Sequence, residues 1–137
     1  MYDSLVPFAP LLALRHAYRL AHSAIREKLK ASRRSPHWEG VRDAFLKTHP
    51  TCAACGGTLH MQVHHKRPFH LDPLLELDPH NFIGLCMGKL DCHLVVGHGG
   101  SFKYYNPDVV DAAHVILTAP GQREAIEFLS KQRRKPL

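Results

Sequence analysis

The amino-acid sequence predicts a small α+β fold in which two short strands and a short helix carry metal ligands between flanking helices. Three observations indicate this class: two close pairs of cysteines, several histidines among them, and helical periodicity on both sides of this segment. With 137 residues, 45% of them hydrophobic and 22% charged, the chain is long enough for one buried core and too short for two. We therefore expect one central domain with attached terminal segments.

We divide the sequence into three parts on this basis. Residues 1–34 are interpreted as an N-terminal basic helical arm, residues 35–110 as the metal-bearing core, and residues 111–137 as a C-terminal helical extension with a basic tail. The formal net charge is +6, and the excess of Lys and Arg lies at the two ends. Such a balance favours polyanionic partners, although charge alone does not distinguish nucleic acid from a membrane surface.

Membrane insertion and export are both disfavoured by the sequence. No run reaches the roughly 18 to 20 apolar residues that a spanning helix needs. The apolar stretch from Leu5 to Leu14 contains two prolines, follows Asp3 and lacks a basic segment before it, so we do not interpret it as a signal peptide. We expect a soluble, cytoplasmic protein.

Helices are predicted on both sides of the cysteine segment. A first helical stripe has apolar residues spaced alternately by three and four, at Leu11, Leu14, Tyr18, Ala21 and Ile25. The basic residues beside this stripe either form a solvated face or lie along phosphates. Ser35-Pro36 indicates the start of a second helix, and His49-Pro50 should end it. Pro120-Gly121 precedes a final helix.

The central segment combines short strands with a short helix. Strands are predicted over Leu59–His64 and Asn81–Leu85, joined by a loop rich in proline and aspartate. A short helix should follow from about Asp91. The pattern of Asp108–Leu117 is ambiguous between helix and strand.

The four cysteines are spaced as ligands of one metal ion. Cys52 and Cys55 form a C-x2-C pair, and Cys86 and Cys92 form a wider pair in which five residues must loop back. Four thiolates satisfy a tetrahedral Zn²⁺ at about 2.3 Å per bond, and Gly56-Gly57 allows a tight turn below the first pair. A disulfide or plain buried thiols are the alternatives, which a reducing compartment disfavours. A closed four-cysteine zinc site would be structural and not catalytic.

Three histidines near these cysteines suggest a second, catalytic site. His64 and His65 are adjacent on a predicted strand and therefore point to opposite faces, so they should have different tasks. One can hold a cation while the other, with a pKa ordinarily near 6.5, acts as a general base at about neutral pH. His93 directly follows Cys92, so the zinc site should fix its position.

These residues carry a resemblance to a known family. The sequence Val63-His64-His65-Lys66-Arg67-Pro68, followed by Asn81 and then by Cys92-His93, resembles the HNH endonucleases, and in particular stand-alone phage and bacterial members with a zinc knuckle. The resemblance covers roughly residues 38 to 107. It implies a ββα-metal (His-Me finger) core and a DNA-binding, metal-dependent hydrolase that leaves 5′-phosphate and 3′-hydroxyl ends.

The resemblance also assigns roles to individual residues. It implies that His64 and His93 ligate a catalytic ion, that His65 activates water, and that Asn81 orients the loop and the base. Imidazole ligands favour Mn²⁺, Ni²⁺, Co²⁺ or Zn²⁺ over Mg²⁺. Some members have a further histidine four residues along the helix, whereas His98 lies five residues after His93.

The role of His98 depends on the local helix. Five steps on a regular α-helix place a residue roughly 140° around the axis, so His98 would miss the ion. Gly97 could break the helix and return His98 to it. Ligation, substrate contact and a plain surface role therefore remain open for this residue.

The remaining expectations concern the substrate. Lys66 and Arg67 either clamp phosphate or form a solvated pair. An active nuclease with weak sequence specificity is the first hypothesis, since no base-reading helix is evident. A non-catalytic zinc-stabilised nucleic-acid-binding module, or an accessory subunit of a phage or mobile-element DNA-processing machine, is the alternative. A homodimer or a larger phage or restriction complex stays open.

Overall fold

The computed structural model of the protein describes residues 17–18, 20–21, 23, 34–130 and 135–137. The chain divides into two units, residues 1–33 and 34–137, and both candidate sites lie in the second unit. The basic arm predicted over residues 1–34, with its helical stripe, falls largely outside the described residues. Among the residues described, no helix is both long and apolar enough to cross a membrane.

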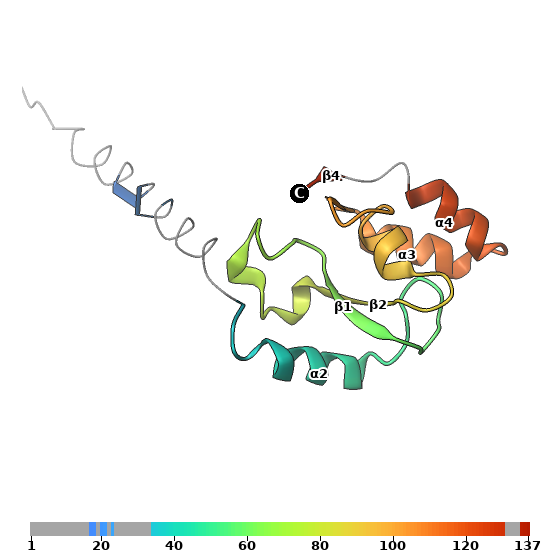
Figure 1. Ribbon diagram of the computed structural model, residues 1–137, viewed down its shortest axis with the longest axis horizontal. Helices are drawn as coiled ribbons and strands as arrows, with labels where there is room; N and C mark the ends of the chain where they lie inside the picture. The colour runs from blue at the N-terminus through green and yellow to red at the C-terminus, as the bar shows by residue number, and fades with distance from the viewer. Residues whose placement is uncertain (1–16, 19, 22, 24–33, 131–134) are drawn as a thin grey trace, which may run out of the picture. The chain divides into compact units, whose positions relative to one another are not determined.

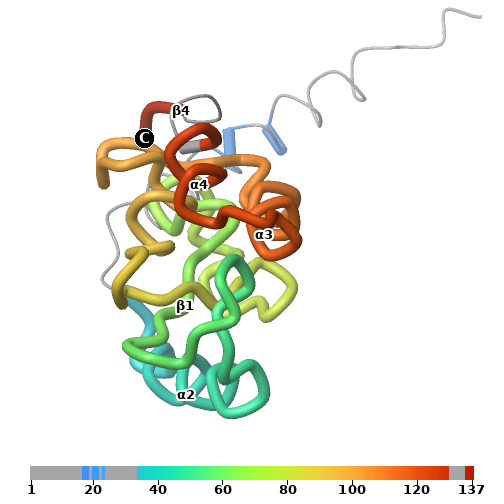
Figure 2. The backbone as a smooth tube through the Cα atoms, turned by 90° about the vertical axis from the view of Figure 1, so that its right-hand side faces the viewer, coloured from blue at the N-terminus to red at the C-terminus, as the bar shows by residue number. Residues whose placement is uncertain are grey.

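The second unit is a mixed α/β structure in three layers. An antiparallel hairpin of β1 (Met61–His65) and β2 (Phe82–Cys86) forms the middle layer, in register from Met61 opposite Cys86 to His65 opposite Phe82. Helix α2 (Trp38–Thr48) lies on one side of it. On the other side lie η3 (His93–Gly97), α3 (Val109–Thr118) and α4 (Gln122–Ser130), as Figures 1 and 2 show. The hairpin and η3 both contribute ligand residues to the candidate sites.

Helix α2 begins later than predicted and ends where predicted. The Trp38 amide donates to the Ser35 carbonyl at 3.1 Å, and the Ser35 hydroxyl accepts from the His37 amide at 3.2 Å. These bonds close a turn over residues 35–38 before the helix starts, so the predicted start at Ser35-Pro36 is wrong by two residues. The predicted end before His49-Pro50 is confirmed.

Strand β1 starts two residues later than predicted, and β2 starts one residue later. The segment between them is a loop with two short 3-10 turns. These turns are η1 (Pro73–Leu75) and η2 (Pro79–Asn81), each beginning at a proline that follows an aspartate. The Asp78 side chain accepts from the His80 amide at 2.9 Å and caps the second turn. Asn81 ends this turn, directly before β2.

The ambiguous segment after residue 108 is a helix. Its buried residues are spaced as one helical face, at Val109, Ala112, Ala113 and Ile116. They pack with Ile126 and Leu129 of α4 and with Leu85 of β2 in one core that includes the cysteines. A two-residue strand pair, β3 (Tyr104–Tyr105) with β4 (Lys135–Pro136), was not predicted.

Candidate metal centres

The four cysteines form one compact cluster. Their Sγ atoms all lie within 4.8 Å of one another, and those of Cys55 and Cys86 are 3.6 Å apart. All four are free thiols and not disulfides. Cys86, at the end of β2, lies with the others despite the wider spacing of the second pair. The cluster could hold a structural metal such as zinc.

Tight backbone turns bring the cysteines together. The Cys52 amide donates to the Gly57 carbonyl at 2.7 Å, and the Gly56 amide donates to the Cys52 carbonyl at 2.8 Å. Gly56 has φ of 72°, a conformation that favours glycine. Asp91 has φ of 44° immediately before Cys92. Cys52 and Cys92, beside these turns, are both buried in the core.

Burial explains why this cluster suits a metal better than four thiols. Cys52, Cys86 and Cys92 are buried among the apolar residues of α3 and α4. The Cys92 thiol donates a hydrogen bond to Cys52, which lowers the pKa of Cys52 to about 4 and raises that of Cys92. Burial raises the pKa of Cys55 to about 11. A bound cation would stabilise all four thiolates together.

A second cluster consists of three histidines. His64 comes from β1, His93 opens η3, and His98 directly follows η3. One ring nitrogen from each lies within 4.8 Å of the others. The ring centroids are 4.8 to 5.3 Å apart, and every pair is close to perpendicular. The structure thus brings together all three residues that sequence analysis considered as ligands of a catalytic ion.

His98 reaches the cluster because η3 is not a regular helix. It is a π-helix, in which hydrogen bonds join residues five apart, so residue i+5 returns close to residue i. The role of His98 was left open because a regular α-helix would turn it away from the ion, and the π-helix instead brings it to His64 and His93. Buried Asn106 supports the turn, since its amide donates to the Gly97 carbonyl at 2.9 Å and its side chain to the Val96 carbonyl at 3.0 Å.

The hydrogen bonds around the three rings leave nitrogen atoms for a cation. The His98 Nδ1–H donates to the Tyr104 carbonyl at 2.7 Å, which leaves the lone pair on Nε2. Within the described part of the chain, buried His64 Nε2 and His93 Nδ1 have no hydrogen-bond partner. Buried polar atoms are normally satisfied, so two unpaired nitrogens in one cluster fit a divalent cation.

The electrostatics of the cluster favour neutral imidazoles. Burial, and then the neighbouring His98 and His93, hold the pKa of His64 well below its usual range. Burial likewise lowers the pKa of His93 to about 4 and lowers that of His98. Because only the neutral ring can ligate a metal, the cluster is prepared for a cation at neutral pH.

His65 lies on the opposite face of β1, as the alternation of a strand requires. Its ring packs against Trp38 at 4.7 Å and Phe82 at 5.1 Å between centroids. Its Nε2–H donates to the Glu76 carbonyl at 2.9 Å, so the lone pair of the neutral ring is on Nδ1. Burial lowers the pKa of His65, and the charge of Arg34 adds to this effect. A neutral ring with a fixed tautomer can accept a proton.

Asn81 fixes the loop that holds His65. Its Oδ1 accepts from the Arg67 amide at 2.8 Å, and its Nδ2 donates to the carbonyls of Arg67 at 3.0 Å and Leu75 at 3.2 Å. Leu75 precedes Glu76, whose carbonyl orients His65. The buried Glu76 carboxylate, in turn, accepts from the Ser35 amide at 3.1 Å. Asn81 and Glu76 therefore hold the His65 ring and its loop in place, and Glu76 was not singled out from sequence.

The three clustered histidines and His65 line one cavity of about 320 Å³, which we call the histidine cavity. Besides His64, His65, His93 and His98, its lining includes four residues that sequence analysis did not assign to a site: Arg34, Phe69, His70 and Phe102. Phe102 is 56% exposed, with its ring 4.9 Å from that of His98. Only chain folding brings these residues to the cavity, so local spacing gave no signal for them.

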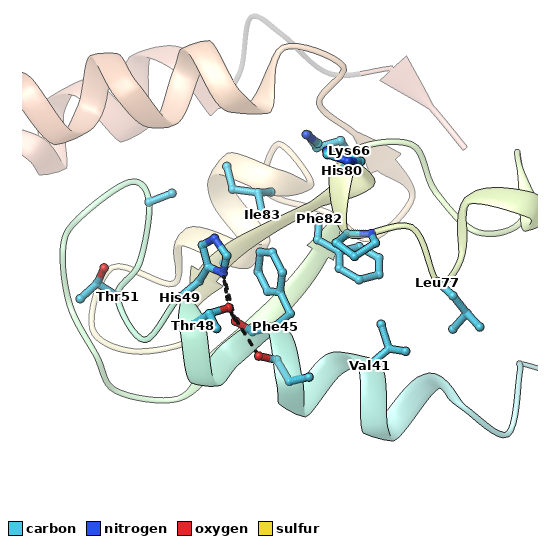
Figure 3. A pocket seen from close by; sticks show the side chains of 14 residues that line it. Val41, Phe45, Thr48, His49, Thr51, Lys66, Leu77, His80, Phe82 and Ile83 are labelled. Carbon is cyan, nitrogen blue, oxygen red and sulfur yellow. Dashed lines mark hydrogen bonds between the residues drawn. The ribbon is translucent and has the colours of Figure 1, made fainter.

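The two predicted phosphate clamps do not line the histidine cavity. Lys66 lines a different, largely apolar cavity between α2 and β2, where Phe45 and Phe82 also lie (Figure 3). The Arg67 guanidinium forms an ion pair with Asp72 at 3.3 Å.

The comparisons with known proteins return nothing for this chain. No family model matches it, and it matches no curated protein and no solved structure. The chemistry of the site must therefore follow from its own geometry.

Proposed function

We propose that the protein is a metal-dependent DNA endonuclease of the HNH type, in which β1, β2 and η3 form a ββα-metal unit. One observation carries the proposal: three imidazoles converge on one point, and His65, with its tautomer fixed, opens onto the same cavity. Ligands for a cation and a general base side by side are what hydrolysis of a phosphodiester requires.

The residues divide between binding a cation and moving a proton. His64, His93 and His98 would hold a divalent cation, and their imidazole donors favour Mn²⁺, Ni²⁺, Co²⁺ or Zn²⁺ over Mg²⁺. When bound, such a cation supplies positive charge that stabilises the phosphoryl oxygens as the transition state forms. The cysteine site would keep η3 in place, because its ligand Cys92 directly precedes His93.

His65 acts as the general base in this proposal. Its Nδ1 takes a proton from a water molecule, whose oxygen forms a bond to phosphorus while the bond from phosphorus to the 3′ oxygen breaks. The departing 3′ oxygen takes a proton from solvent, and His65 releases its proton to solvent. The products are 5′-phosphate and 3′-hydroxyl ends. The Glu76 carbonyl, kept in place through Asn81, holds the ring and stabilises its protonated form.

DNA is the proposed substrate because of charge as well as chemistry. The formal net charge of +6 favours a polyanion. The alternative, a non-catalytic zinc-stabilised binding module, needs only the cysteine cluster. It gives no reason for two buried imidazole nitrogens without a partner.

Cleavage of supercoiled plasmid tests the proposal. The protein is treated with EDTA, its cysteine-bound metal is checked, and Mg²⁺, Mn²⁺, Ni²⁺ or Zn²⁺ is added back. We expect metal-dependent nicking that falls by about 100-fold or more in His65→Ala, as for loss of a general base. His114→Ala, an exposed histidine of α3, is the matched control and should cut like the wild type. No cutting with any metal by folded, zinc-loaded protein would favour the binding module.

A further inference from the structure

Arg34 stands at the start of the second unit and lines the histidine cavity. It is exposed, so its guanidinium is accessible to a ligand. Among the described side chains that line this cavity, it is the only one with a permanent charge, because the others are imidazoles or apolar groups. A negatively charged ligand in the cavity would therefore meet Arg34.

Aromatic rings hold the Arg34 guanidinium at the cavity. Its Cζ lies 4.7 Å from the centroid of the Trp38 ring and 5.7 Å from that of Phe69. Stacking on an aromatic face fixes the plane of a guanidinium while its N–H edge remains available for hydrogen bonds. Trp38 also packs against His65, so the proposed base and the arginine share one support.

Arg34 differs in this respect from two other arginines of the unit. Arg42 is paired with Asp43 at 2.9 Å, and Arg67 is paired with Asp72 at 3.3 Å. Within the described residues Arg34 has no such carboxylate partner. An arginine that is oriented by aromatic rings and left without a counter-ion is arranged to receive an anion.

We propose that Arg34 anchors a phosphate group of the substrate in the histidine cavity, beside His65. The proposal rests on the proposed nuclease function for the nature of the ligand, a phosphodiester. The planar guanidinium matches two phosphate oxygens and would hold the phosphorus in reach of the base. Arg34 takes the role that sequence analysis gave to Lys66 and Arg67.

Binding of a minimal ligand tests this assignment without any cleavage. A thymidine dinucleotide with one phosphodiester is titrated by calorimetry into the zinc-loaded protein without added catalytic metal. We expect binding about tenfold weaker in Arg34→Gln, and a smaller loss in Arg34→Lys, which keeps the charge but not the fork. Arg42→Gln should bind like the wild type. Trp38 is the only tryptophan, so its fluorescence should change on binding and report this site.

A second measurement counts phosphate contacts on longer DNA. Anisotropy of a labelled duplex is measured across a range of salt concentrations. The slope of log binding constant against log salt concentration gives the number of phosphate contacts, which should fall by about one in Arg34→Gln and be unchanged in Arg42→Gln. Equal dinucleotide affinity and equal salt slope in folded Arg34→Gln and wild type would overturn the proposal. Inorganic phosphate that binds through Arg34 as tightly as the dinucleotide would overturn the assignment to a phosphodiester.

These outcomes separate the anchor from the nuclease function. Dinucleotide binding that depends on Arg34, in a protein that never cuts, would support the phosphate anchor and count against the nuclease. Cutting that depends on His65 but not on Arg34 would support the nuclease and overturn the anchor.

Discussion

Gly97 lies directly against the imidazole of His64: a β-carbon added at Gly97 would be 2.8 Å from both Cε1 and Nδ1 of that ring. Both residues are buried, so the ring has little room to move away. The His64 ring therefore occupies space that only a residue without a side chain at position 97 leaves open. This contact joins η3 to β1 at the centre of the histidine cluster.

Gly97→Ala should displace His64 and weaken the cluster. We expect an affinity for Mn²⁺ about 10-fold lower or more, and an unfolding free energy lower by about 1–3 kcal/mol, as for other overpacked sites. Calorimetric titration and urea denaturation measure the two effects. Gly40→Ala in α2 is the matched control, because no described atom lies within 4 Å of its added β-carbon. It should raise stability by about 0.5–1 kcal/mol. Equal behaviour of the two variants would contradict this account.

Asn81→Ala removes three hydrogen bonds that join the end of η2 to the preceding loop, at Arg67 and Leu75. The carbonyls and amide left behind are partly buried, so we expect a loss of about 1–3 kcal/mol in unfolding free energy. Because the Glu76 carbonyl would no longer be held, nicking should slow even at saturating metal, while the metal affinity of the histidine cluster should change little. Urea denaturation and metal-saturated plasmid assays measure the two effects, and unchanged stability would contradict the prediction.

The adjacent residues Cys92 and His93 should each be needed to bind a different metal ion. Cys92→Ser removes one thiolate from the cysteine cluster, so the zinc that we propose this cluster binds should be lost, and the protein should unfold at a clearly lower temperature. His93→Ala should keep that zinc at one ion per chain but lose the second metal. Elemental analysis after dialysis, combined with thermal melting, distinguishes the variants. Loss of the same ion in both would mean that the two clusters are not separate sites.

Stability should fall on acidification as the buried histidines are forced to take up protons. Their folded-state pKa values lie below the unfolded value of about 6.5, so the unfolded chain binds more protons below that pH. The neutral histidines therefore make their full contribution to the unfolding free energy above about pH 6.5. It should decline as the pH falls toward the folded-state values, which for His93 is about 4.

Urea denaturation between pH 8 and pH 5 checks this linkage. His93→Gln should show a pH slope smaller by up to about 1.4 kcal/mol per pH unit, the contribution of one proton. The cysteine cluster is the same in both proteins, so its own response to acid cancels in the comparison. Identical slopes would show that His93 titrates normally in the folded protein.

The sequence by itself determined the features that depend on neighbours along the chain. The C-x2-C spacing, the turn at Gly56 and the opposite faces of His64 and His65 follow from local geometry, and the structure has them all. The end of α2 at His49-Pro50 is of the same kind, because a proline restricts the residue before it.

Only the tertiary structure decided the features that depend on packing between distant segments. Asp108–Leu117 could be helix or strand until the core with α4 and β2 selected a helix. His98 joined the cluster through a π-helix that Asn106 supports, and no periodicity rule predicts that geometry. Arg34 reached the histidine cavity beside His64 and His93, which lie far from it in the sequence. Such contacts depend on which surfaces meet, and residue spacing does not encode them.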